Sequence, residues 1–527
     1  SVDRNGRRWA FDGQGVIVRS EPDGSNFEVF ASGLRNVHEF DFDNYGNLIT
    51  VDNDGDHAGE NERLVYLIDG SDSGWRINWQ FCKYSDDRNN DYKGWMDEGY
   101  SLPRFEDQAA LILPPLDLYH NGPAGMVYNP GTALDESWQN HFFVAGFTGT
   151  PPRAAIHAFT LKPKGVSFEL DEDRVVVDGI LATGLSFGPD GALYMADWIE
   201  GWQPNQEGRI WRVDTPGSAD SEIREETRRL LAGSFEDMDR DRLGDLLGHA
   251  DRRVRLKAQF ELAERGDLEL FAGILESAEA GQLSRIHSIW GVGQIARAES
   301  RTARYLLPFL KEADPEIRAQ AARAAGDARY REAVDELIPL LEDEEPRVRL
   351  LTLEALGRIG DPAAVEAVTR LLEREDDREV YFRQAGAIAL SRMSDGRSLG
   401  QLAGHPSRAV RIAAVVALKR LEHPAVAAFL DDDDEYIVTN AARAINDDNF
   451  ISEAVPELAR LADGERFVNE PLMRRAINAS LYSGTAEDAE RLAALAARRD
   501  IPTVIREEAL ATLNVWEEPS LFDRVTG

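Results

Sequence analysis

The densest group of potential ligand side chains lies near the N-terminus. Within eleven residues the sequence places five carboxylates: Asp52, Asp54, Asp56, Glu60 and Glu62. Ca²⁺ takes about six to eight oxygen ligands, so a loop this rich in carboxylates suits it, although the spacing is not that of an EF-hand. Because five carboxylates would repel one another without a cation, we expect a metal here. A solvated acidic loop is the alternative.

Histidine is the natural candidate for a general base, because imidazole titrates near neutral pH. Five histidines precede residue 215, at His38, His57, His120, His141 and His157. We name only His120, which lies beside Asn121 and Gly122, as a candidate catalytic residue. The catalytic residue is otherwise unassigned.

The composition changes abruptly along the chain. Residues 1–215 are rich in Gly, Asp, Asn and Trp with short β-type runs, whereas residues 223–527 are rich in Ala, Leu, Glu and Arg with helical periodicity. The polar, turn-forming stretch at 216–222 is typical of a linker. We therefore predict a multidomain β + α protein.

The second part repeats itself about every 31 residues. An arginine opens each Ala/Leu-rich helix, at Arg255, Arg285, Arg318, Arg349, Arg383, Arg411, Arg474 and Arg506. This period predicts an α-solenoid, with roughly nine units between Leu230 and Trp516. The pattern resembles short HEAT-like repeats of the phycocyanobilin-lyase type, in which such arginines are structural. A solenoid of this kind offers a concave surface to a protein partner.

The first part contains a longer repeat. Residues 43–52 and 188–197 share one design, in which an Asp-containing turn with glycine leads into an alternating strand that ends in Asp. Their turn glycines, Gly46 and Gly191, are 145 residues apart, which fits three units of about 48 residues. About four blades of a β-propeller fit into 215 residues, so we predict part of a propeller.

Short motifs in this part resemble the soluble glucose/sorbosone dehydrogenase family. They are Gly-Leu-Arg-Asn at 33–36, Asp-Asn-Asp-Gly-Asp at 52–56 and Gly-Ser-Asp-Ser-Gly-Trp at 70–75. The runs at 121–125, 197–202 and 285–291 are similar to the planctomycete-type membrane-bound dehydrogenases, which join such a propeller to HEAT repeats and often to a cytochrome c domain.

The resemblance implies a six-bladed, calcium-dependent propeller that uses pyrroloquinoline quinone (PQQ) to oxidise a sugar or aldehyde. On this sequence Arg35 and Asn36 would contact the quinone, and Arg209 would add a second cation. The alternative is that Arg35 and Asn36 only close a turn. The backbone carbonyls of Asp54 and Gly55 would hold the calcium. The expected metal site comprises Asp52, Asp54, Gly55, Asp56 and Glu62.

Charge, hydropathy and cysteine content argue against several other classes of protein. The net charge of −35 repels phosphate backbones, so we expect no nucleic-acid partner. No apolar run is long enough for a transmembrane helix. The single cysteine excludes a Cys-x-x-Cys-His haem attachment, so an electron acceptor such as cytochrome c would be a separate partner. The family resemblance implies a periplasmic or cell-surface location.

Two functions fit these patterns. The first is a calcium-dependent quinoprotein that oxidises a sugar or aldehyde while the solenoid docks a partner. The second is a non-catalytic, calcium-stabilised propeller and HEAT module that binds glycan or protein. Fold alone does not decide between them, because propellers carry many unrelated activities.

Overall fold

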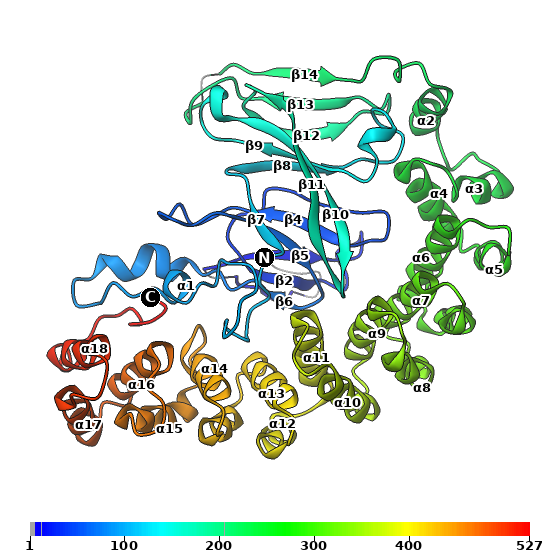
Figure 1. Cartoon of the computed structure of the whole chain (residues 1–527). Coiled ribbons are helices and arrows are strands. Elements are labelled where there is room, and N and C mark those ends of the chain that lie inside the picture. The colour runs from blue at the N-terminus through cyan, green and yellow to red at the C-terminus, as the bar shows by residue number, and fades with distance from the viewer. Residues whose placement is uncertain (1–5, 12, 205) are drawn as a thin grey trace.

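The computed structural model describes residues 6–11, 13–204 and 206–527, with strands in the first part of the chain and helices in the second (Figure 1). The last strand, β14, ends at Val213, and the first helix of the solenoid, α2, begins at Glu222. The stretch at 216–222 that the sequence marks as a linker follows β14, and α2 begins at its last residue.

The strands form four separate sheets. The first contains β1 (Gly15–Arg19), β2 (Glu28–Leu34) and β6 (Ser71–Asp72); the second β3 (Phe40–Phe42), β4 (Leu48–Asp52), β5 (Glu62–Leu67) and β7 (Asp117–Tyr119); the third β8 (Pro123–Tyr128), β9 (Phe142–Gly146), β10 (Ala155–Lys164) and β11 (Ser167–Asp178); the fourth β12 (Ala182–Phe187), β13 (Leu193–Asp197) and β14 (Arg209–Val213). Among the described strands no pairing closes a sheet into a barrel, so strand order alone does not establish the predicted propeller.

Matching turns occur in the second and fourth sheets. Gly46, between β3 and β4, has φ +73°, and Gly191, between β12 and β13, has φ +76°. Glycine adopts this left-handed conformation without a side-chain clash. The predicted count of three repeat units between these glycines is wrong, because only the third sheet separates the second from the fourth. The long connection at 73–116, which contains α1 (Gly94–Asp97), supplies the additional length.

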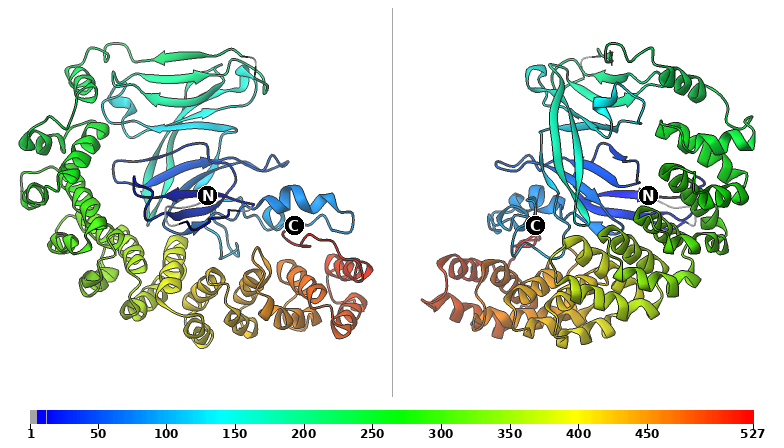
Figure 2. Two further views of the ribbon diagram at one scale, coloured as in Figure 1. Left: turned by 180° about the vertical axis from the view of Figure 1, so that it is seen from behind. Right: turned by 45° about the vertical axis from the view of Figure 1, so that its right-hand side comes forward.

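The helices form a curved solenoid that wraps around the sheets, and both views of Figure 2 show the same enclosure. They are α2 (Glu222–Ala232), α3 (Arg240–Leu246), α4 (Arg252–Glu264), α5 (Leu268–Glu276), α6 (Gln282–Ala298), α7 (Pro315–Asp327), α8 (Val334–Leu337), α9 (Pro346–Ile359), α10 (Val365–Glu375), α11 (Val380–Met393), α12 (Gly396–Gln401), α13 (Arg408–Arg420), α14 (Glu435–Asn446), α15 (Val455–Arg460), α16 (Glu470–Ser483), α17 (Ala486–Ala497) and α18 (Thr503–Asn514). In Figure 1 α4, α6, α7, α9, α11, α13, α14 and α16 make up the inner row that faces the sheets.

The repeated arginines are structural, as the sequence predicts. Arg255, Arg318 and Arg411 each donate from Nη1 to the backbone carbonyls five and six residues earlier, at 2.7–3.1 Å. Arg349 makes the same pair of bonds, at 2.7 and 3.1 Å. Each arginine thereby satisfies carbonyls in the turn before its own helix, which fixes the angle between successive helices.

The inner face of the solenoid is occupied by the chain's own N-terminal half. Inner-row side chains bond to it as follows: Arg252 to Asp41, Arg255 to Asn44, Gln320 to the carbonyl of Tyr45, Arg392 to Asp69, Gln384 to the carbonyls of Ala110 and Ile112, and Asn440 to the N–H of Ala110. These contacts cover part of the concave face on which a separate protein, such as a cytochrome c, is expected to dock. Docking of such a partner stays a prediction for the surfaces that they leave free.

Glu98, which follows α1, joins the two halves through buried charges. Its carboxylate pairs with Arg443 of α14 and Arg475 of α16, both at 2.7 Å, and all three side chains are at most 4% exposed. The hydroxyl of Tyr92 donates to the same carboxylate at 2.8 Å. Burial alone would raise the pKa of Glu98, but the guanidinium groups of Arg475 and Arg443 outweigh it and lower the pKa to about 2.

Replacing Glu98 therefore tests how firmly the halves are joined. Glu98→Gln leaves the buried guanidinium of Arg443 without its counter-charge, while Arg475 keeps its pair with Asp447. We expect the variant to lower the free energy of unfolding by about 3–5 kcal/mol, measured by urea denaturation. Glu366→Gln is the matched control, because Glu366 pairs with Arg370 on the exposed surface, with side chains 86% and 54% exposed. The control should cost less than about 1 kcal/mol. If Glu98→Gln and Glu366→Gln lowered the free energy of unfolding equally, the buried network would not contribute specially to stability.

Candidate functional site

The acidic loop lies between β4 and β5, and its first carboxylate is fully buried. Asp52 accepts the backbone N–H groups of Arg35 at 3.0 Å and Asn36 at 2.9 Å, and it pairs with the buried guanidinium of Arg63. Asp52 therefore fixes the 35–36 turn against the end of β4.

Two further carboxylates of the loop are buried and bonded to N–H donors. Glu60 accepts from the indole of Trp95 at 2.6 Å and from the N–H of Gly55 at 2.7 Å. Glu62 accepts from the N–H of Gly122 at 2.7 Å and from that of Asp54. Burial raises the pKa of Glu62 to about 7, against the opposing effect of its hydrogen bonds, and the nearby Asp54 and Asp52 add to the increase. Burial likewise raises the pKa of Glu60.

The remaining members of the predicted metal site lie at the rim of the loop. Asp56 is 78% exposed and pairs with Arg35 at 2.7 Å. Asp54 accepts from the N–H of Asp56 at 3.1 Å, and burial raises its pKa. The carbonyl of Gly55 accepts from the side-chain amide of Gln80. These oxygens thus have donors within the protein.

This arrangement does not match a calcium site made of the predicted side chains. Within the described part of the chain, the carboxylates of the loop are not brought together in threes around a common point. Their N–H and guanidinium partners already account for the shape of the loop. Calcium binding at Asp52, Asp54, Gly55, Asp56 and Glu62 stays a prediction that these contacts do not support.

The residues expected to hold the quinone are likewise paired within the protein. Arg35 is held by Asp56, the Asn36 amide contacts the His38 ring at 3.0 Å, and Arg209 pairs with Asp197 at 3.2 Å. A quinone carboxylate would have to displace a carboxylate from each arginine. We therefore derive no chemical step through PQQ, and that cofactor also stays a prediction.

Two cavities lie where the solenoid meets the sheets. One, of about 540 Å³, is lined by charged and aromatic side chains that include Arg76, Trp79 and Arg475. The other, of about 300 Å³, is lined mainly by arginines and carboxylates, among them Arg19 and Arg358. The residues predicted to bind the cofactor line neither of them.

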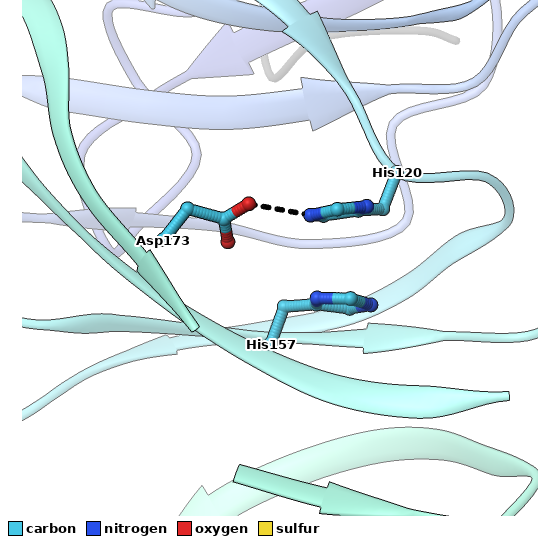
Figure 3. Close-up of side chains that lie close together, drawn as sticks. All are labelled: His120, His157 and Asp173. Atoms are coloured by element: carbon cyan, nitrogen blue, oxygen red, sulfur yellow. Dashed lines mark hydrogen bonds and ion pairs between the residues drawn. The ribbon is translucent and has the colours of Figure 1, made fainter. Parts of the chain in front are cut away.

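His120, the candidate for catalysis, lies elsewhere and has two neighbours that the sequence did not associate with it. It follows β7, and its Nε2 lies 2.5 Å from Oδ2 of Asp173 on β11. The ring of His157, on β10, stacks on that of His120 with centroids 3.7 Å apart and planes 14° apart (Figure 3). Burial, followed by the proximity of His120, lowers the pKa of His157.

The sequence contained one usable signal for this cluster. The strands at 155–164 and 167–178 form a hairpin in which Phe159 lies opposite Asp173, so His157 and Asp173 are diagonal neighbours. A predicted hairpin register would have brought these two together. Nothing local, however, indicated that the loop carrying His120 reaches the same point, because that contact joins the second sheet to the third.

With the geometry described, comparison with known proteins defines the class of the helical half. Residues 303–391 match the model of a family described as HEAT repeats. This match supports the predicted HEAT-like solenoid and, with it, one half of the predicted family resemblance. The comparisons give no support to the dehydrogenase half. No curated protein matches the chain.

Several solved structures align with about half of the chain. The complex of CpcE and CpcF of phycocyanin lyase from Nostoc sp. PCC7120 is 22% identical and covers 49% of this chain and 90% of its own, with a TM-score of 0.24. An archaeal HEAT-like repeats protein from Thermococcus onnurineus NA1 is 16% identical over 47% of this chain and 97% of its own, with a TM-score of 0.27. Human deoxyhypusine hydroxylase is 17% identical and covers 49% of this chain and 97% of its own, with a TM-score of 0.20.

None of the helices in the described residues has the length and apolar character needed to cross a membrane. The expected periplasmic or cell-surface location stays a prediction.

The raised pKa of Glu62 leads to a prediction about how the stability of the protein depends on pH. In the unfolded chain this group loses its proton near its ordinary value of 4.5, whereas in the folded protein it does so near 7. Between these values the folded state binds more protons, so the contribution of Glu62 to stability falls as the pH rises from about 4.5 to 7, by about 3 kcal/mol.

The measurement is urea denaturation of the wild type and of Glu62→Gln across this pH range. The variant loses one hydrogen bond from a backbone N–H at every pH, but it has no carboxyl proton to release. Its free energy of unfolding relative to the wild type should therefore improve by about 3 kcal/mol between pH 4.5 and 7. Glu236→Gln, at an exposed position, is the control and should follow the wild type. A difference between Glu62→Gln and wild type that does not change with pH would contradict the raised pKa.

Proposed function

We propose that this chain is a non-catalytic protein-interaction module, in which the HEAT-like solenoid holds the sheets as a rigid recognition unit. The observation that carries the proposal is which surfaces of the two halves are covered and which are exposed. The solenoid uses its inner face to hold its own sheets, while the outer edge of the fourth sheet remains uncovered with large apolar side chains on it.

That outer edge is β14, at the end of the fourth sheet. Its pairing in the described structure is with β13 alone. Ile210 and Trp211 on this strand are 75% and 40% exposed, and Trp202, in the preceding loop, is 67% exposed. We call these three residues the edge patch; within it, Ile210 and Trp211 are successive strand residues and lie on opposite faces of the sheet. Exposed apolar groups of this size next to an unpaired strand edge favour protein contact.

The edge patch is held in place in spite of its exposure. The Trp202 ring packs against Phe147 with centroids 5.1 Å apart and lies directly over Gly149, where a β-carbon would collide with it. The indole N–H of Trp211 donates to Asp197 at 2.9 Å. Aromatic side chains that are already fixed lose little entropy on binding, and such residues commonly dominate the affinity of an interface.

We also propose that the four sheets are blades of a β-propeller. Four consecutive sheets of three or four strands, three of them antiparallel throughout, support this arrangement, as do the matching turns at Gly46 and Gly191. In a propeller the open face of the fourth sheet is where a further blade would pack, and Ile210, which pairs with the exposed Ala196, lies on that face.

The edge patch can be tested by quantitative affinity capture with the full chain as bait. Ile210→Asp places a charge in the patch without altering buried packing, and it should reduce recovery of a specific protein partner at least tenfold. Leu510→Asp is the matched control, because Leu510 is 57% exposed on α18 and lies outside the patch. We expect recovery with this variant to equal that of the wild type.

Three results would overturn the proposal. Equal recovery with wild type and Ile210→Asp would show that the edge patch is not the interface. Reduction of a redox dye by sugars or aldehydes, when the chain is supplied with calcium and PQQ, would establish the dehydrogenase function instead. Binding to a glycan array in the absence of a protein partner would replace protein by carbohydrate as the ligand.

A further inference from the structure

Three side chains of metal-ligating type meet where the second sheet joins the third. His120 comes from the loop after β7, His157 from β10 and Asp173 from β11, and one ligand atom from each lies within 4.8 Å of the others (Figure 3). Among the described residues, no other set of three or more histidine, cysteine or acidic side chains has its ligand atoms this close together.

We propose that His120, His157 and Asp173 bind a divalent transition-metal ion, with Zn²⁺ as the ion of best fit, and that the metal ties the second sheet to the third. The proposal is independent of the edge patch, which lies on the fourth sheet.

The separations are compatible with a metal after small movements. Tetrahedral zinc binds nitrogen and oxygen at about 2.0–2.1 Å, which places its ligand atoms roughly 3.3 Å apart. His120 Nε2 and Asp173 Oδ2 are already closer than that, at 2.5 Å, and would separate to admit the ion. His120 is 44% exposed and Asp173 is 26% exposed, so the ion can enter from solvent without unfolding of the sheets.

The stacked rings favour a neutral state of at least one imidazole. Two imidazolium cations with centroids 3.7 Å apart would repel each other strongly, so at least one of the two rings is neutral. A neutral imidazole has the free lone pair that a metal requires. The rings are close to parallel, so their in-plane lone pairs do not converge in this arrangement, and joint binding of one ion requires the more exposed His120 ring to rotate out of the stack.

A neighbouring residue already orients the carboxylate as in a metal centre. The hydroxyl of Tyr119 donates to Oδ1 of Asp173 at 3.2 Å, which leaves Oδ2 directed at the histidines. Tyr119 is buried, and its ring packs edge-on against Phe159 with centroids 5.3 Å apart. Outer hydrogen bonds of this kind fix ligand orientation and strengthen metal binding.

The donor set decides which ion fits. Two imidazole nitrogens and one carboxylate oxygen suit Zn²⁺ and its neighbours in the first transition row, whereas Ca²⁺ and Mg²⁺ prefer oxygen ligands alone. Three protein ligands leave a coordination position for water. The three ligands come from two sheets, so binding would stabilise the folded state by linkage.

The test is calorimetric titration of the chelator-treated full chain, freed of any histidine tag, with Zn²⁺ and in parallel with Ca²⁺. We expect one Zn²⁺ per chain, a rise in melting temperature on binding and no competition from excess Ca²⁺. Co²⁺ should give a visible absorption spectrum of a nitrogen- and oxygen-ligated site, which reports the ligands directly and not merely the stability.

Variants of the three positions make the test specific. His120→Ala should weaken Zn²⁺ binding at least a hundredfold, and Tyr119→Phe, which removes only the outer hydrogen bond, about tenfold. His57→Ala, at a histidine outside the cluster, should bind as the wild type does. His120 is exposed, so its removal tests the site even if His157→Ala fails to fold. Absence of a stoichiometric Zn²⁺ signal, or unchanged affinity in His120→Ala, would overturn the proposal and leave a plain His–Asp hydrogen bond.

Discussion

The ion pairs buried between the solenoid and the sheets are the interaction on which the rest of the structure depends. Glu98 meets Arg443 and Arg475 in a region from which water is largely excluded, and removal of Glu98 leaves the buried Arg443 without its counter-charge. The same principle operates farther along the inner face, where Asp69 holds Arg358 and Arg392. These pairs specify one orientation of the two halves, because each needs its partner at hydrogen-bonding distance.

This intramolecular contact changes what a HEAT-like solenoid can do here. In an isolated solenoid the concave row of polar side chains is the obvious place for a ligand, but here Gln320, Gln384 and Asn440 bond to the backbone of the N-terminal half. Recognition of other molecules is therefore left to surfaces that the solenoid does not cover. The free edge of the fourth sheet is one such surface, and the rigidity of the rest keeps its aromatic side chains in place.

The acidic loop shows how composition can mislead about chemistry. Five carboxylates in eleven residues suggest a cation, yet Asp52, Glu60 and Glu62 are buried acceptors for backbone, indole and guanidinium donors. These fixed donors account for the shape of the loop, and calcium binding there stays a prediction. The group with a suitable mixture of ligand types, around His120 and His157, was instead scattered over more than fifty residues of sequence.

The sequence by itself determined the elements whose causes are local or periodic. The arginine spacing marked the solenoid, and Arg255, Arg318, Arg349 and Arg411 bond to carbonyls only five or six residues away. The turns at Gly46 and Gly191 formed because glycine adopts a left-handed conformation at no steric cost. Only the tertiary structure decided which charges meet. The contact of Glu98 with Arg475 spans 377 residues and that of His120 with Asp173 spans 53. Such contacts follow from how the two halves and successive sheets pack, and no local spacing in the chain encodes that packing.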